Sequence, residues 1–203
     1  MPGTSSMEHA MQPDTERILV PLAAGFEEIE AVAIIDILRR ADLDVTVAGI
    51  AAGPVRGSHG IEIVPDAELG ALDLGHFTLL VLPGGMPGTR NLIADERVVG
   101  LVQRLAREGR TTAAICAAPL VLQKAGILRG LEVTAHPSVR DELSGAGGVA
   151  VRAEPRVLQS GQVITSQGAG TAIEFALALV ALLRGPEHAE KIARAIVAAR
   201  AES

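Results

Sequence analysis

The sequence predicts a doubly wound α/β sandwich, in which a mostly parallel sheet lies between two layers of helices and has a small antiparallel ribbon at one edge. Three observations support this fold class. From Ile18 onward, short β-rich runs alternate with helical stretches, which is typical of a parallel sheet. Two predicted strands, ILVPLA and LLVLPGG, are nearly continuous in apolar residues, as expected for strands covered on both faces. The connections are short and rich in glycine and proline.

The alternation defines the elements in turn. The expected order is strand 18–23, helix 27–43, strand 44–50, strand 77–85, helix 96–110, strand 111–115 and helix 118–128. Two period-two segments, 56–66 and 149–167, interrupt this order, and the second reads as two strands joined through SGQ that form the edge ribbon. The T-x-x-E pattern at Thr171–Glu174 predicts a capping box that starts a helix through about Leu183. A last amphipathic helix is expected over 186–201, with Pro186 in its first turn.

Length and the polar start of the chain predict the domain organisation. A chain of 203 residues suits one domain with a full core. Residues 1–17 are polar and carry acids where a signal peptide would have an apolar segment. We therefore expect a disordered N-terminal extension over 1–17 and a single domain over 18–201.

Composition and charge exclude several classes of partner. The chain has no tryptophan or tyrosine for base stacking, and its net charge near −6 would repel a phosphate backbone. A single cysteine cannot form an internal disulfide. The longest apolar runs, such as 175–183, are about half the length that spans a bilayer. The expectation is a cytoplasmic protein that binds neither nucleic acid nor a membrane.

Cys116 falls at the junction between the strand 111–115 and the helical stretch that begins at Ala117. In an open parallel sheet, ligands bind beyond the carboxyl ends of the strands, where the following helices present free N–H groups. Such amides and the helix dipole stabilise a thiolate and lower a cysteine pKa from about 8.5 towards roughly 3.5 to 7.5. Two interpretations stay open here: a nucleophile at a bend, or a small side chain that fills the core.

Glu30 lies in the middle of the apolar stripe of the first helix, while Asp36, Arg39 and Arg40 occupy the opposite arc. A carboxyl group carried inward must be paired or protonated, because burying it charged and alone is costly. The helix follows the first strand, so Glu30 reaches the same sheet edge as Cys116. It therefore either donates a proton to a thiolate at Cys116 or pairs with a lysine or arginine elsewhere.

Glycines and a histidine also reach this edge. Gly84 and Gly85 end a strand and permit close backbone approach and free amides, which are the components of an oxyanion hole. They lack the spacing of nucleotide-binding motifs, so no cofactor is expected. His136 follows a strand and precedes a proline, which places it at the same edge. The histidines show no metal-ligand spacing, and no metal is expected.

Five segments carry a family resemblance: GFEEIEAVAIIDILRRA, VLPGG, AAICAAP, VTAHP and TSQGAGTAIEFALAL. Together they resemble the ThiJ/PfpI superfamily over about 18–185, in particular the branch that contains the parkinsonism-associated deglycase and its bacterial relatives. The resemblance implies a flavodoxin-like three-layer sandwich, a homodimer and a reactive cysteine at a strained nucleophile elbow, Cys116. It also implies that Glu30 bonds to this cysteine, that the amides of Gly85 and Ala117 form the oxyanion hole, and that His136 is the nearby family histidine.

The function implied by this resemblance is cofactor-free handling of small α-oxoaldehydes or glycated substrates, of the glyoxalase and deglycase type. Cys116 would attack methylglyoxal or glyoxal, Glu30 would move protons, and lactate or glycolate would leave. The alternative is a non-catalytic sensor of oxidative stress, in which Cys116 is oxidised to a sulfinate. A third reading, an amidase or peptidase-like hydrolase, is weaker because Ala117 stands where the protease-like branch has histidine. His59 stands where some relatives have arginine.

Overall fold

The computed structural model describes residues 16–145 and 147–198. Its centre is a seven-stranded sheet in the order β10-β11-β7-β6-β1-β2-β5. The strands are β1 (Arg17–Leu22), β2 (Asp44–Gly49), β5 (Ala67–Glu68), β6 (Leu79–Leu82), β7 (Thr112–Ile115), β10 (Val157–Ser160) and β11 (Val163–Ser166). Every neighbouring pair is parallel except β10 and β11. The mostly parallel sheet with one antiparallel edge strand is therefore confirmed.

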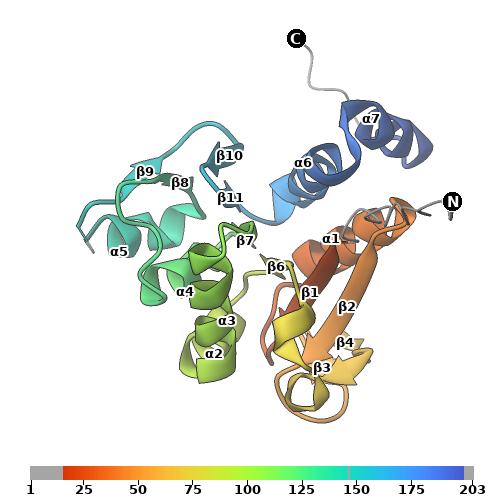
Figure 1. Ribbon diagram of the computed structural model, residues 1–203, viewed down its shortest axis with the longest axis horizontal. Coiled ribbons are helices and arrows are strands. Elements are labelled where there is room, and N and C mark those ends of the chain that lie inside the picture. Colours follow the sequence, from red (N-terminus) through yellow and green to blue (C-terminus); the bar gives the residue numbers. More distant parts are fainter. Residues whose placement is uncertain (1–15, 146, 199–203) are drawn as a thin grey trace, which may run out of the picture.

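Helices cover both faces of the sheet (Figure 1). They are α1 (Glu28–Arg40), α2 (Gly88–Ala94), α3 (Glu96–Arg107), α4 (Pro119–Lys124), α5 (Arg140–Gly145), α6 (Ala172–Arg184) and α7 (Pro186–Ala195). One apolar core joins the sheet to α1, α6 and α7, and the other joins it to α2, α3, α4 and α5. The three-layer sandwich is confirmed, and its two cores explain why β1, β6 and β7 read as continuous apolar runs.

Two short strand pairs lie outside the main sheet. The segment 56–66 contributes β4 (Glu62–Ile63), which pairs with β3 (Val55–Arg56) as a separate antiparallel ribbon. From the segment 149–167, β9 (Ala150–Arg152) pairs in parallel with β8 (Glu132–Thr134). Only the second half of that segment, β10 and β11, forms the ribbon at the sheet edge.

The helix after Thr171 begins where expected, but the predicted capping box is wrong. The Thr171 hydroxyl is hydrogen-bonded to Gly168 and Ser166, and it does not cap α6. Glu174 forms an ion pair with Arg156 at 2.8 Å. Both side chains bond to residues outside α6, so neither is available to the free amides at its start.

The start of the fold also differs from the expected boundary at Ile18. Arg17 is the first residue of β1, and the Thr78 hydroxyl bonds to both Glu16 and Arg17. The rest of the expected extension, 1–15, lies outside the described residues, as do 199–201 at the end of the last predicted helix. In the part of the chain that the structure describes, no helix combines the length and apolarity needed to cross a membrane.

Candidate active site

The carboxyl ends of β1, β6 and β7 are neighbours in the sheet, and the chain leaves each of them towards the same edge. The segment after β1 leads into α1, the segment after β6 contains the glycine turn, and the residue after β7 is Cys116. This topology brings together Glu30, Gly84, Gly85, Cys116 and Ala117. These residues are far apart in the sequence, and Gly84 and Glu30, which share a hydrogen bond, are separated by 54 residues. The crossover connections between parallel strands bring them to the same edge.

Cys116 has a left-handed backbone conformation, with φ of 63°. Such a conformation in a residue other than glycine costs of order 1 to 3 kcal/mol and requires support from its surroundings. Two backbone hydrogen bonds supply it: the Cys116 N–H donates to Ser166 O at 2.9 Å, and the His136 N–H donates to Cys116 O at 2.9 Å. The predicted bend between strand and helix therefore exists, and it holds a partly exposed free thiol.

Glu30 is fully buried. Its Oε2 accepts a hydrogen bond from the Gly84 N–H at 2.8 Å, and its carboxyl group is also hydrogen-bonded to the Cys116 thiol. Oε1 has no conventional hydrogen-bond partner among the described residues. No described lysine or arginine forms an ion pair with this carboxyl group. Of the two alternatives that the sequence left open, the structure therefore shows the pairing with Cys116.

The carboxyl group and the thiol control each other's charge. Burial raises the pKa of Glu30 to about 7, although its hydrogen bonds from Gly84 and Cys116 oppose the rise. Burial and the negative charge of Glu30 raise the pKa of Cys116 to about 12, and the Gly85 and Ala117 amides oppose this. The predicted net lowering of the cysteine pKa is therefore wrong, because burial outweighs the two amides and the charge of Glu30 adds to the rise. When Glu30 is protonated, its charge disappears and it can donate to the sulfur, which favours the thiolate.

The glycine turn is shaped around the thiol. A Cβ atom on Gly84 would lie 2.7 Å from Cys116 Cβ and 2.9 Å from Glu30 Oε2, so only glycine fits there. Gly85 has φ of 93°, and its amide and that of Ala117 hydrogen-bond to the sulfur. Gly84 was also expected to help form the oxyanion hole. Its N–H instead donates to Glu30, which leaves the Gly85 and Ala117 amides to face a developing charge.

His136 lies near the thiol without bonding to it. A Cβ atom on Gly168 would lie 3.4 Å from His136 Cδ2 and 3.9 Å from Cys116 Sγ, so both side chains pack around this glycine. The His136 Nδ1 atom accepts from the Ser138 N–H at 3.3 Å and lies 2.8 Å from Ser138 Oγ. An accepting Nδ1 places the ring proton of the neutral histidine on Nε2. His136 therefore offers a donor at the rim of the site, and a direct role in proton removal from the thiol has no support in this geometry.

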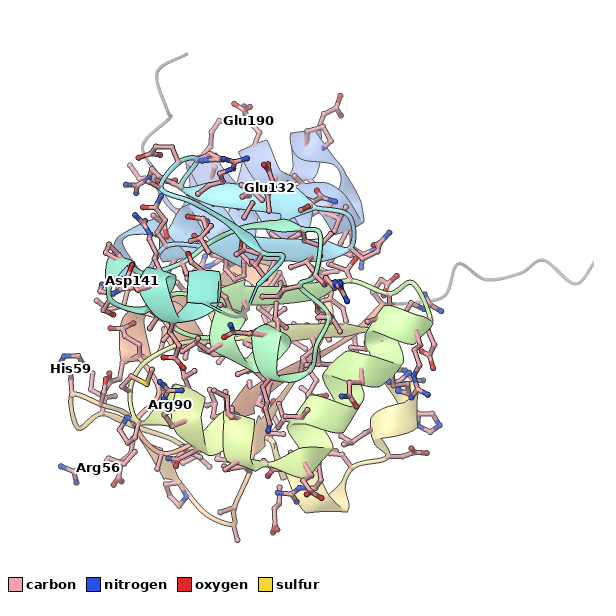
Figure 2. The ribbon with its side chains drawn as sticks, turned by 90° about the vertical axis from the view of Figure 1, so that its left-hand side faces the viewer. Arg56, His59, Arg90, Glu132, Asp141 and Glu190 are labelled. Carbon is pink, nitrogen blue, oxygen red and sulfur yellow. The ribbon has the colours of Figure 1, made fainter. Side chains whose placement is uncertain are left out.

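Glu28 is a buried acid that the sequence analysis did not single out. Its carboxylate accepts from the His59 N–H at 2.6 Å, the Ile61 N–H at 3.4 Å and the Ser58 hydroxyl at 3.2 Å. The His59 Nδ1 atom lies 3.1 Å from Glu28 Oε2, and Figure 2 shows His59 at the outer edge of the molecule. The repeated acids in EEIE were a usable signal, but the partners lie about thirty residues away along the chain.

Glu27, Glu28 and His59 could also offer ligand atoms to a metal ion, since these atoms lie within 4.8 Å of one another. The hydrogen bonds of Glu28 and Glu27 within the protein already use these oxygens to hold the 58–61 loop and the start of α1. The group therefore has a structural explanation that requires no ion.

Comparison with known proteins places this geometry in a family. The chain is 42% identical to the Parkinson disease protein 7 homolog of Danio rerio over 181 residues, which cover 87% of this chain and 94% of the relative. It is 38% identical over 175 residues to the glutathione-independent glyoxalase DJR-1.2 of Caenorhabditis elegans, with coverage of 86% and 91%. It is 39% identical to protein DJ-1 homolog A of Arabidopsis thaliana over 90% of this chain but only 46% of that longer relative.

Solved structures agree with the sequence comparison. The crystal structure of Drosophila melanogaster DJ-1beta superposes with a TM-score of 0.87 at 36% identity and covers 92% of this chain and all of that one. A structure of Toxoplasma gondii DJ-1, oxidized, gives a TM-score of 0.84 at 37% identity, with coverage of 91% and 100%. A model of the DJ-1/PfpI family matches residues 16–182. The resemblance found in the sequence is thus confirmed, and the chain belongs to the DJ-1/PfpI family.

Proposed function

We propose that this protein is a cofactor-independent glyoxalase that converts small α-oxoaldehydes to α-hydroxy acids through Cys116. One observation carries the proposal: a strained, partly exposed thiol faces a buried carboxyl group whose pKa is raised to about 7. A group with that pKa can both donate and accept a proton near neutral pH. The name of the Caenorhabditis elegans relative, a glutathione-independent glyoxalase, supports the same activity.

The chemistry follows from the positions of the groups. With Glu30 protonated, the thiolate adds to the aldehyde carbon of methylglyoxal and forms a hemithioacetal, while the Gly85 and Ala117 amides stabilise the oxyanion. The oxyanion takes the proton of Glu30. The Glu30 carboxylate then removes the proton on C1 and returns it to C2 through an enediol, while the hydroxyl proton moves from O1 to O2. This step leaves a thioester of lactate on the sulfur. Water cleaves the thioester, and the thiol and lactate are released, so one methylglyoxal and one water give one lactic acid.

The test is formation of D-lactate from methylglyoxal by purified protein without glutathione. We expect turnover in the wild type, and a loss of roughly 100- to 10,000-fold in Cys116→Ser and Glu30→Ala. His76→Ala is a suitable control, since His76 is exposed and its side chain forms an ion pair with Asp73, away from the site. Unchanged lactate formation in the two site variants would reject the assignment. Whether glycated proteins are also substrates is measured with the same variants on a methylglyoxal-treated peptide.

A second candidate is a sensor of oxidative stress, favoured by the isolation of the thiol and by the oxidised state named for the Toxoplasma gondii relative. Hydrogen peroxide would add two oxygens in succession, each with release of water, and give a sulfinate beside Glu30 and the amides of Gly85 and Ala117. Intact mass after mild peroxide treatment tests this. A gain of two oxygens that is absent in Cys116→Ser supports the sensor, whereas an inert thiol contradicts it.

We also propose that the protein is a homodimer through the apolar groove beside α1. Ile29, Val32 and Ile61 are at least half exposed there, and Ile173 of α6 extends the same surface. The groove also carries Asp36 and Arg40, so a second copy related by a twofold axis would find both apolar surface and opposite charge. This surface lies on the opposite arc of α1 from buried Ile34 and Leu38, whereas Ile37 lines the groove.

Light scattering coupled to gel filtration tests the dimer. We expect a mass of two chains for the wild type and a shift towards one chain in Val32→Asp. Val64→Asp is the matched control, since Val64 is 78% exposed but does not line the groove. A single-chain mass for the wild type would reject the proposal.

A cytoplasmic location stays a prediction, and imaging of a tagged full-length chain would examine it.

A further inference from the structure

Glu27 links the two segments that form the candidate active site. It caps α1, because its Oε2 accepts from the Glu30 N–H at 2.7 Å. Its own N–H donates to Gly84 O at 2.9 Å. A Cβ atom on Gly85 would lie 2.4 Å from the Glu27 nitrogen, so the glycine turn packs directly on this residue. Glu27 therefore contacts both the helix that carries the acid and the turn that supplies the amides.

Three hydrogen bonds form a closed ring among Glu27, Glu30 and Gly84. The Glu27 N–H donates to Gly84 O, the Gly84 N–H donates to Glu30 Oε2, and the Glu30 N–H donates to Glu27 Oε2. Each residue takes part in two of the three bonds, so displacement of one residue changes its bonds to both of the others. Within this ring, Glu27 contributes the side chain that caps the helix. Glu27 is half-buried, whereas Glu30 and Gly84 are buried.

We propose that Glu27 is a positioning residue of the thiol site, whose carboxylate holds the Glu30 backbone against the Gly84 turn. Its negative charge adds to the effect of burial and favours the protonated form of Glu30. The consequence for chemistry is indirect. A protonated Glu30 leaves Cys116 without a negative neighbour, which permits the reactive thiolate. The inference deepens the proposed glyoxalase function and rests on it for its catalytic meaning, although the geometry is independent of the substrate.

The charges around α1 support this assignment. Next to burial, which is the main cause, the Glu27 charge raises the pKa of Glu30. Glu28 on the same helix is bonded to the 58–61 loop. On α6 and β2, which pack against α1, the charged side chains are Glu174, Arg184 and Asp44, and the first two bond to Arg156 and to Asp42 O. Glu27 and Cys116 are thus the ionisable groups that act on Glu30.

The experiment is the rate of alkylation of Cys116 by iodoacetamide as a function of pH, which requires no aldehyde turnover. In Glu27→Gln the amide oxygen can still cap α1, but the charge is lost. Glu30 then ionises at lower pH, and its charge disfavours the thiolate. We expect a roughly three- to tenfold slower reaction at neutral pH, which corresponds to a change of about half to one pKa unit. Glu27→Asp retains charge and cap and should react like the wild type.

A double-mutant cycle separates positioning from a general structural effect. In a Glu30→Gln background, where no proton can leave residue 30, Glu27→Gln should change the rate less than twofold. Asp95→Asn is the matched control, because Asp95 caps α3 through the Arg97 N–H at 3.0 Å and lies on another helix. We expect no change of rate in this control.

Two results would overturn the inference: an unchanged alkylation profile in Glu27→Gln, or the same decrease in the presence and absence of Glu30. Circular dichroism of each variant shows whether it is folded, and Glu27→Ser, which can cap α1 without a charge, replaces Glu27→Gln if that variant is unfolded. A wild type that makes no lactate but shows the expected cycle would reject the glyoxalase and leave the role of Glu27 intact. Lactate formation with no coupling in the cycle would do the reverse.

Discussion

Glu28 and Glu30 lie on the same helix and are both buried, yet their carboxyl groups have opposite acid–base properties. The pKa of Glu30 is raised from 4.5 to about 7, whereas that of Glu28 is lowered from 4.5 to about 2. Burial acts in the same direction on both, towards the neutral acid. The difference comes from the donors, since Glu28 accepts from two N–H groups and a hydroxyl, with a histidine ring beside it, while Glu30 accepts from one N–H group and the thiol.

The comparison separates a structural acid from a chemical one. A carboxylate whose oxygens are saturated with donors stays charged and holds a loop in place. One with a single amide donor and an unpartnered oxygen can change its protonation state at neutral pH, and Glu30 Oε1 is such an oxygen among the residues that the structure describes. Burial alone therefore does not distinguish the two acids, but the number of hydrogen-bond donors to each carboxyl group does.

The largest expected effect is on turnover, when the one amide donor of Glu30 is displaced. A Cβ atom in Gly84→Ala would lie 2.7 Å from Cys116 Cβ and 2.8 Å from Ile115 O, so the turn must move away from Glu30. We expect a decrease in kcat/KM for methylglyoxal of roughly 100-fold. Gly100→Ala is the control, because a Cβ atom there meets nothing within 4 Å and the residue lies in α3. Equal activity of the two variants would contradict the described packing.

The second expected effect is on stability, through Glu28. In Glu28→Gln the His59 and Ile61 amides lose a charged acceptor, and the free energy of unfolding should fall by about 3 kcal/mol at pH 7. The folded-state pKa lies below the ordinary value, so this contribution is present above pH 4.5 and is lost as the pH falls towards 2. Urea unfolding at several pH values measures it. Glu62→Gln removes only an exposed ion pair at 3.9 Å and should change little.

The third effect is smaller and has the opposite sign. The pKa of Glu30 is raised in the folded state, so its neutral form favours folding below pH 4.5, and that contribution is lost as the pH rises through about 7. Glu30→Gln cannot ionise and keeps an acceptor for Gly84. We expect it to match the wild type near pH 4 and to be more stable by about 2 kcal/mol near pH 8. A variant that is less stable at pH 8 would show that the carboxyl group is stabilised as an anion.

Much of the fold follows from the sequence because the apolar runs of β1, β6 and β7 can only be central strands. The site follows as far as topology determines it, since carboxyl ends of neighbouring parallel strands must share an edge. This reasoning brings Cys116, Glu30 and the Gly84–Gly85 turn together correctly. The position of Glu30 in the apolar stripe of α1 is the local signal that identified it as unusual.

The rest depends on contacts between distant segments, which periodicity does not encode. Thr171 and Glu174 match a capping box, but Ser166 and Arg156 compete for them from another element. The hydrogen bonds to the Glu28 carboxylate come from the 58–61 loop, and the raised pKa of Cys116 comes first from burial and then from the charge of Glu30. The position of Cys116 before a helix predicted a low pKa, because the strand-to-helix pattern does not show how deeply the thiol is buried.

The central claim is that Glu30 and Cys116 share one proton, and the thiolate absorbance measured against pH tests it most directly. Spectra of Cys116→Ser provide the background for the wild type and for Glu30→Gln. The account predicts that the thiolate of Glu30→Gln appears at clearly lower pH, because the variant lacks the negative charge that, next to burial, raises the cysteine pKa to about 12. Identical titration curves in the wild type and Glu30→Gln, each near the ordinary cysteine pKa, would contradict it.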